Sequence, residues 1–364
     1  MLLTLATFFF VLGVLVLVHE FGHFLAAKRL GIKVEEFGVG FPPRIWGKKI
    51  GETLYSINLL PIGGFVRLFG EDEAEASAKF VSEPGFEKKR AFFAKTPLER
   101  SSVLIAGVVM NFLLGWLIIS FLFTQGVMTP TDKVHIDEVE KGSPADIAGL
   151  LPKDVISEIK SLDGSQVFQI KSSKQLVETT DKFRGREIIL AVEREGTFLD
   201  LPITPREKTS ANEGAMGVVV SNFEEKAYPP HLAPFLGLKE AFNMSKQLIL
   251  GIADMVIKLV TFRGVNRDIA GPVGIAELTG QAVKFGKLAV LELMGLLSLN
   301  LAIINLLPIP ALDGGRLLFV ALEGLTKKKV KPAVEKYMHQ IGLLLLLTLL
   351  VFATINDILR LLGR

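Results

Sequence analysis

The sequence predicts a polytopic α-helical membrane protein with four transmembrane helices, a membrane-associated β-hairpin region and one extracytoplasmic α+β domain. Three observations predict this class: a mean hydropathy of +0.43, four long uncharged stretches, and a polar, turn-rich stretch between the second and third of them. Only 22% of the 364 residues are charged and the net charge is +3, which excludes a disordered chain and a nucleic-acid partner. There is no cysteine, so any metal must be held by histidine and carboxylate groups.

Four stretches lack charge over nearly the length of about 20 helical residues that crosses a bilayer. We predict transmembrane helices at 1–27, 101–126, 288–316 and 339–362. The segments between them are a loop at 28–100, a folded domain at 127–206, a linker at 207–287 and a second loop at 317–338.

The positive charges orient these helices. Lys28 and Arg29 directly follow the first apolar run, and a lysine cluster at 327–331 lies between the third and fourth. Because positively charged loops stay on the cytoplasmic side, both loops are predicted to be cytoplasmic. Both termini and the domain at 127–206 are then extracytoplasmic.

A fifth apolar segment, 238–260, could change this count. Charged residues recur along it, and a charge at mid-membrane is unfavourable. We interpret it as an amphipathic helix of the linker that lies on the lipid surface. The alternative, a fifth span, would move every later segment to the opposite side.

The first helix contains a metal-binding pattern, His19-Glu20-Phe21-Gly22-His23. Helical residues four apart share one face, so both imidazoles can reach a single Zn²⁺ at about 2.0–2.1 Å. In this pattern Glu20 is placed to act as the general base. Ionisable residues in a lipid-soluble helix are unfavourable unless they have a function, which favours a metal site over structural histidines.

A zinc site of this type needs a third protein ligand, and Asp313 is the candidate. With four spans, the first and third helices run in the same direction, so Asp313 reaches the same side as the two histidines. Pro308 and Pro310 break the helix just before it, and two glycines after it permit close approach. A helix cap beside Arg316 is the other role open to Asp313.

These motifs together resemble the site-2 protease family of intramembrane zinc metalloproteases, and most closely its bacterial group of regulator of sigma-E proteases with a single PDZ domain. The resemblance covers nearly the whole chain. It implies that His19, His23 and Asp313 ligate zinc and that Glu20 is catalytic. It also implies a bacterial cytoplasmic (inner) membrane location and single-span membrane proteins as substrates, such as an anti-sigma factor or a signal-peptide remnant.

The same resemblance points to two further residues. The chain also departs from some relatives in two ways: it has one PDZ module where they have two, and it lacks a proline in the second helix. Asn300 and Asn305 match asparagines that the family associates with substrate positioning. In lipid their amides could instead hydrogen-bond neighbouring helices. Several relatives have a proline after Ala-Gly in the second helix, where this chain has Ala106-Gly107-Val108, followed by Asn111.

The domain at 127–206 has motifs in the order of a PDZ domain, including Val134–Val139, Gly142–Ala145 and a later strand at Ile188–Arg194. PDZ domains bind an extended peptide as an added strand, so peptide ligands are expected. The domain could instead act as a size filter for membrane substrates or as a simple spacer.

In the first loop, Thr53–Leu60 and Phe65–Phe69 are predicted to be short strands joined as a hairpin through Pro61–Gly64. An open strand edge beside the zinc could bind an extended substrate. The alternative is a hairpin that stays in the cytoplasm with no role at the site.

The sequence thus predicts an intramembrane zinc metalloendopeptidase that cleaves transmembrane segments in regulated intramembrane proteolysis. Two other classes stay open: a non-catalytic PDZ receptor or scaffold, and an intramembrane metal transporter. Glu20 disfavours the scaffold, because a purely structural metal site needs no base.

Overall fold

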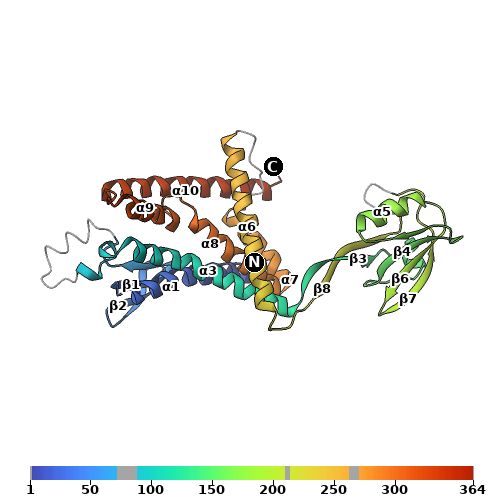
Figure 1. The fold of residues 1–364 in the computed structure, drawn as a ribbon, viewed down its shortest axis with the longest axis horizontal. Coiled ribbons are helices and arrows are strands. Elements are labelled where there is room, and N and C mark those ends of the chain that lie inside the picture. Colours follow the sequence, from blue (N-terminus) through green and yellow to red (C-terminus); the bar gives the residue numbers. More distant parts are fainter. Residues whose placement is uncertain (1, 72–87, 210–213, 262–269, 364) are drawn as a thin grey trace. The chain divides into compact units, whose positions relative to one another are not determined.

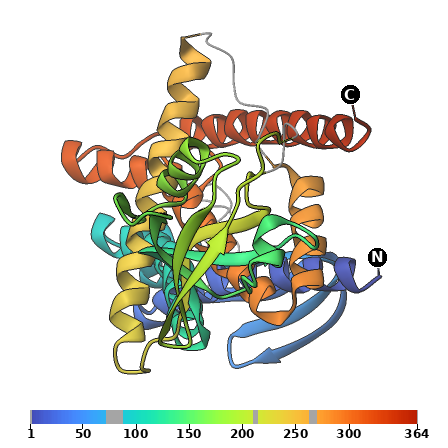
Figure 2. The same ribbon diagram turned by 90° about the vertical axis from the view of Figure 1, so that its right-hand side faces the viewer.

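The computed structural model describes residues 2–71, 88–209, 214–261 and 270–363. The chain divides into two compact units, which we name the helical unit (Met1–Leu122 with Pro229–Arg364) and the β unit (Phe123–Tyr228). The elements appear in Figures 1 and 2. In chain order they are α1 Leu2–Arg29, β1 Val34–Ile50, β2 Thr53–Leu68, the short 3₁₀ helices η1 Lys88–Arg90 and η2 Phe92–Ala94, α3 Pro97–Gln125, β3 Val127–Val139, α4 Pro144–Ile147, β4 Val155–Ser161, β5 Val167–Gln169, α5 Ser173–Lys182, β6 Ile188–Arg194, β7 Thr197–Ile203, β8 Val218–Lys226, α6 Ala233–Val260, α7 Pro272–Phe285, α8 Lys287–Leu306, α9 Asp313–Thr326 and α10 Pro332–Leu361.

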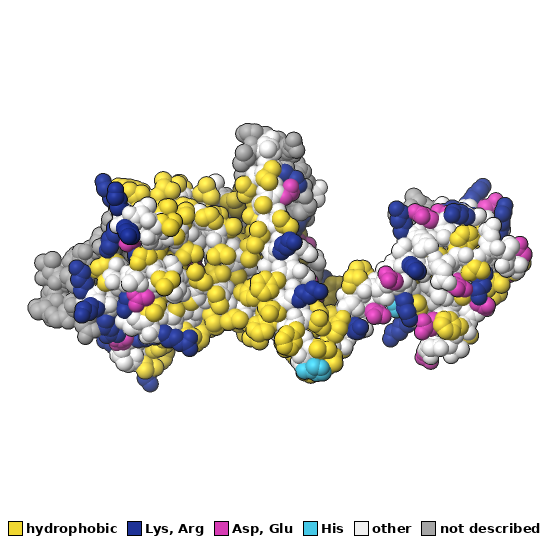
Figure 3. All heavy atoms as spheres, in the orientation of Figure 1, with side chains coloured by type: hydrophobic (Ala, Val, Ile, Leu, Met, Phe, Trp, Pro, Cys, Tyr) yellow, Lys and Arg dark blue, Asp and Glu magenta, His cyan; other side chains and the backbone are white. Residues whose placement is uncertain are grey.

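Four of the described helices are long and apolar enough to cross a membrane: α1, α3, α8 and α10. Apolar side chains cover much of the helical unit's surface (Figure 3). On α10, for example, Leu344 is 67% exposed and Phe352 is 74% exposed. An apolar surface this large is stable in lipid rather than in water. The chain is therefore a multi-pass membrane protein, as the sequence predicts.

Helix α6 differs from these four. It is 28 residues long but carries five charged residues along its length. In both ribbon views it crosses α10 at a steep angle instead of running alongside it (Figures 1 and 2). Its placement on the lipid surface stays a prediction, and both features agree with it.

The third predicted span is shorter than expected. We expected one helix over 288–316, whereas α8 ends at Leu306 and Asp313 begins a new helix, α9. The prolines of the segment between them cannot continue α8, and Ala311 has a φ of 82°, which no helix accommodates. The predicted loop at 317–338 is correspondingly helical over most of its length, and α10 begins at Pro332 rather than at 339.

The predicted hairpin between Thr53–Leu60 and Phe65–Phe69 is wrong. Both segments belong largely to one bent strand, β2, and the turn of the hairpin lies between β1 and β2 instead. In the register, Phe37 of β1 is paired with Val66 at one end of β2 and with Tyr55 at the other. The first half of β1 therefore lies between the two ends of β2, because the Pro61–Gly64 segment bends the strand rather than reversing it tightly.

The β unit contains a six-stranded sheet in the order β7-β6-β4-β3-β8, with β5 paired to β4. Its core is aliphatic and includes Ile136, Ile156, Ile159 and Leu190, all almost fully buried. We expected the domain to end at 206, but β8 pairs along β3 and completes the sheet. That pairing joins residues from 79 (Val139 and Val218) to 99 (Val127 and Lys226) positions apart, which local sequence patterns do not reveal. Its assignment as a PDZ domain stays a prediction.

One buried carboxyl group ties the last span to α7. Asp357 of α10 is 1% exposed and accepts hydrogen bonds from the backbone N–H groups of Gly271 (3.2 Å) and Gly274 (2.7 Å). These are otherwise unpaired donors at the start of α7. A Cβ on Gly271 would lie 2.8 Å from Asp357 Oδ2, so glycine is required for this approach.

Candidate metal centre

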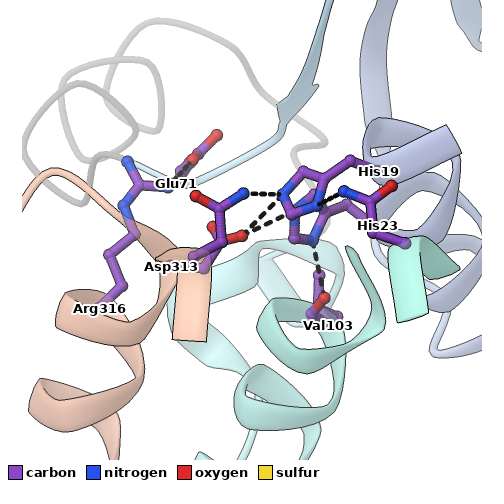
Figure 4. A network of polar contacts seen from close by, with 8 residues as sticks. His19, His23, Glu71, Val103, Asp313 and Arg316 are labelled. Atoms are coloured by element: carbon purple, nitrogen blue, oxygen red, sulfur yellow. Dashed lines mark hydrogen bonds and ion pairs between the residues drawn. The ribbon is translucent and has the colours of Figure 1, made fainter. Parts of the chain in front are cut away.

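Two histidines of α1 and one aspartate of α9 converge on a single point (Figure 4). His19 Nε2 lies 2.9 Å and His23 Nε2 lies 3.3 Å from Asp313 Oδ2, and the two Nε2 atoms are 3.2 Å apart. Both histidines are buried, and Asp313 is partly so. The structure therefore brings together three residues that are up to 294 positions apart in the sequence.

The spacing of these three atoms fits a metal ion. Ligand atoms about 2.0–2.1 Å from a tetrahedral Zn²⁺ lie about 3.3 Å from one another. The observed separations of 2.9, 3.2 and 3.3 Å are close to that value. Two imidazoles and one carboxylate are also a donor set that zinc accepts when no thiolate is available. The residues present thus fit a three-ligand site with a fourth position left for water or substrate.

The sequence around Asp313 explains how the acid reaches this point. A Cβ on Gly314 would lie 2.1 Å from Leu307 O, and one on Gly315 would lie 2.3 Å from Ile309 O. Only glycine at both positions lets the segment after α8 fold closely against the first turn of α9. Asp313 lies in that first turn, where the helix dipole favours a negative charge. Arg316 pairs with Glu71 rather than with Asp313, so the alternative of an Arg316-bound cap is not what the structure shows.

Helix α3 packs closely against the two histidines. A Cβ on Gly107 would lie 2.5 Å from His23 Nε2 and 2.8 Å from His19 Cε1. On α1, a Cβ on Gly22 would lie 2.3 Å from Ala106 O. Small residues on facing helices permit this approach in membrane proteins. The histidine rings therefore occupy the space that a side chain at position 107 would fill.

The sequence alone did not identify which groups face the other ring nitrogens. His23 Nδ1 donates a hydrogen bond to Val103 O (2.8 Å), and Asn111 Nδ2 lies 3.3 Å from His19 Nδ1. Asn111 is fully buried. The available signal was an amide in an otherwise apolar stretch, where polar side chains are unfavourable without a partner.

A cavity of about 200 Å³ opens beside the cluster. Glu20 lines it together with the ligand side chains, so the predicted base faces the same space as the metal-binding atoms. Phe65 and Val66 of β2 form part of another wall, and the Arg316–Glu71 ion pair lies in a further part of the lining (Figure 4). A Cβ on Gly64 would lie 3.7 Å from Glu20 Cγ, which places β2 directly against the base.

The two candidate substrate-positioning residues lie differently on α8. Asn305 Nδ2 is 3.3 Å from His19 Nε2, so the structure brings its amide to the cluster. Asn300 is half-buried earlier on the same helix and forms no hydrogen bond with the cluster among the described residues. Its predicted role stays a prediction.

Comparison with known proteins agrees with this geometry. Peptidase family M50, the site-2 protease family, matches residues 7–349. The chain belongs to peptidase family M50. The family resemblance seen in the motifs is thereby confirmed.

The similar proteins cover nearly the whole chain. A protein from Rhizobium meliloti is 32% identical over 371 residues, which cover 98% of this chain and 96% of that protein. Zinc metalloprotease RasP from Oceanobacillus iheyensis is 31% identical over 438 residues, covering 98% of this chain and 99% of its own length. RasP from Geobacillus kaustophilus is also 31% identical, with coverage of 98% and 97%.

Proposed function

We propose that this zinc metalloprotease of family M50 cleaves transmembrane segments of single-span membrane proteins, with His19, His23 and Asp313 as metal ligands and Glu20 as the catalytic base. The observation that carries the proposal is the position of the cluster. Two of its ligands lie on α1, a helix apolar enough to span the membrane, and the cavity beside them contains Glu20. Ionisable residues on a helix that spans the membrane are energetically unfavourable, so their presence there favours a site that acts within the membrane.

The roles of the side chains follow from their chemistry. When bound, zinc would supply Lewis acidity, which makes water a usable nucleophile at neutral pH and polarises the scissile carbonyl. Glu20 accepts the proton of the attacking water and delivers it to the leaving amine. The two histidines must present neutral Nε2 atoms to the ion, and Asp313 neutralises part of its charge.

The edge of β2 is the proposed binding site for substrate. A transmembrane helix hides its carbonyls in its own hydrogen bonds, so it must unwind before it can be cleaved. Among the described residues, Phe65 and Val66 pair only with β1, and both line the cavity. Their other edge can form backbone hydrogen bonds with an extended substrate segment and replace those that the helix loses.

The amide of Asn305 is placed to help position that segment. Its nitrogen lies at the cluster, where it can donate a hydrogen bond to a substrate carbonyl. We assign Asn300, which lies earlier on α8, a supporting role in substrate positioning, on the family resemblance alone.

The proposed location is the bacterial cytoplasmic membrane, with both termini and the β unit on the extracytoplasmic side. Lys28 and Arg29 in the last turn of α1 support this orientation. The β unit would then meet the outer parts of substrates, either by binding a peptide or by excluding proteins with bulky outer domains. Anti-sigma factors and signal-peptide remnants are the proposed substrates of such an enzyme.

The test compares Glu20→Gln with Asp313→Asn in purified full-length protein. Glu20→Gln keeps all three ligands, so it should bind zinc while cleavage of a transmembrane model substrate falls by about 10²–10⁴-fold. Asp313→Asn should lose both zinc and activity. Glu292→Gln, an exposed glutamate of α8 that does not line the cavity, is the matched control and should behave as wild type.

The outcomes also separate the rival functions. Normal cleavage by Glu20→Gln would refute the proposed mechanism. Zinc flux into proteoliposomes without any peptide cleavage would indicate a transporter, and bound zinc with neither activity would indicate a scaffold.

A further inference from the structure

The two histidines differ in what meets the ring nitrogen that faces away from the cluster. For His23 this atom is Nδ1, which donates to the backbone oxygen of Val103 at 2.8 Å in a buried position. The bond holds the proton on Nδ1 and leaves the Nε2 lone pair directed at the cluster. His19 also presents Nε2 to the cluster, so it requires a proton on Nδ1 and an acceptor for that proton.

The group found beside His19 Nδ1 is the side-chain amide of Asn111, with Nδ2 at 3.3 Å. An amide nitrogen only donates, and a protonated Nδ1 also only donates, so these two atoms cannot form a hydrogen bond. Meanwhile Asn111 Oδ1 is buried and has no hydrogen-bond partner among the described residues. A half-turn of the amide exchanges its oxygen and nitrogen, and it gives both His19 Nδ1 and the orphaned oxygen a partner.

We propose that Asn111 is a positioning residue for the metal: in the zinc-loaded enzyme its Oδ1 accepts the hydrogen bond from His19 Nδ1–H and fixes the ring with Nε2 toward the ion. This inference rests on the proposed metal role of His19. Val103, Gly107 and Asn111 are spaced four residues apart, so they share one face of α3. Val103 O holds His23, Gly107 leaves room for both rings, and Asn111 holds His19.

A purely structural role for the amide is less consistent with its contacts. The backbone oxygen of Asn111 already accepts a hydrogen bond from Ser298 Oγ at 2.7 Å, which links α3 to α8 without the side chain. Among the described residues, the only polar group within hydrogen-bond distance of the amide itself is the His19 ring. Helix α3 contributes no ligand, yet it determines the protonated nitrogen of both histidine ligands.

The test measures zinc affinity by chelator competition in the purified full-length protein. Asn111→Leu removes the acceptor, and Asn111→Asp keeps one in nearly the same shape. We expect Asn111→Leu to lower zinc affinity by about 10–100-fold, as is typical when an outer partner of a histidine ligand is lost. Asn111→Asp should retain zinc. Ser298→Ala should retain it too, because this variant removes only the hydrogen bond from Ser298 Oγ to the backbone oxygen of Asn111.

Melting temperatures of the zinc-free variants separate positioning from folding. Equal zinc-free melting temperatures with reduced affinity in Asn111→Leu would support the proposal. Wild-type affinity in Asn111→Leu would overturn it, and so would an equal loss in Asn111→Asp. Wild-type protein and Asp313→Asn serve as references: if wild type binds no zinc, the metal role of His19 itself fails. If only Asp313→Asn loses zinc, the role of Asn111 alone fails.

Discussion

The helical unit and the β unit bury polar side chains for different purposes. In the β unit, Ser143 and Ser172 accept hydrogen bonds at the starts of α4 and α5, and Asp154 is bonded to Arg194. Each of these groups completes a turn, a helix end or a strand contact. In the helical unit, His19 and His23 are buried against a carboxylate from a distant helix, where they complete no secondary structure.

This difference teaches where function can be sought in such a chain. The β unit has a closed aliphatic core and a surface dense in charge, as expected of a domain in water (Figure 3). The helical unit has an apolar surface, so each polar group inside it is unfavourable unless something compensates for it. In the β unit a buried polar residue therefore indicates stability. In the helical unit it indicates either a hydrogen bond between helices, as at Asp357, or chemistry, as at His19 and His23. The three predictions below test that division.

The largest expected effect is on the stability of the β unit. Leu190→Ala removes a fully buried side chain from its core and should lower the free energy of unfolding of that unit by about 2–5 kcal/mol. Protease susceptibility of the full-length protein in increasing urea would measure it. Zinc affinity should not change. If zinc were lost as well, the two units would not be separable in this way.

The next prediction concerns the helical unit. Gly107→Ala places a methyl group within 2.5 Å of His23 Nε2, so the ligands must move. A displacement of about 1 Å at a reacting centre can lower activity by about 10²-fold. Cleavage and zinc affinity should both fall. Gly13→Ala is the matched control, because a Cβ there meets no atom within 4 Å. Similar losses in both variants would mean that packing, not the metal site, is affected.

The smallest expected effect is a pH-dependent change in the stability of the β unit. Burial alone would raise the pKa of Asp154, but hydrogen bonds from Arg194 and from the Leu151 N–H outweigh it and hold that pKa below its usual value. The resulting stabilisation is present above the unfolded pKa of about 3.9 and is lost as the pH falls through the lower folded value.

We therefore expect the β unit to lose stability below about pH 4, and Asp154→Asn to remove part of this pH dependence. At pH 7 the variant should be destabilised by about 1–3 kcal/mol, because a charged hydrogen bond is lost. Urea unfolding followed by proteolysis at several pH values would measure both. An unchanged pH profile in Asp154→Asn would contradict the assignment.

Much of the helical unit could be predicted from sequence because its signals are local. Uncharged length identified the four helices, and two histidines four residues apart defined one face of α1. Asp313 could be predicted as the third ligand because the number of spans gives the direction of each helix, and so the side of the membrane that Asp313 reaches. Pro308 and Pro310 marked the break before Asp313, but the new helix α9 that begins there, after Ala311 adopts a positive φ, was not predicted.

The remaining features depend on contacts between distant segments. The role of Gly107 arises from a ring on another helix, and the bend of β2 arises from its pairing with both sides of β1. In the β unit, β8 was missed because its partner strand lies far earlier in the chain. The hydrophobic periodicity of a segment does not indicate which distant segment it pairs with.

The carboxyl group of Asp357 limits how the helical unit can move. It holds the first turn of α7 through two N–H groups, and the glycines there leave no space for another arrangement. If α10 moved along α7 by one turn, the Asp357 carboxyl group would be buried in an apolar environment without its two hydrogen-bond donors, which is energetically unfavourable. We therefore expect α7 and α10 to move as one body, and any separation of helices that admits a substrate to occur between other pairs of helices.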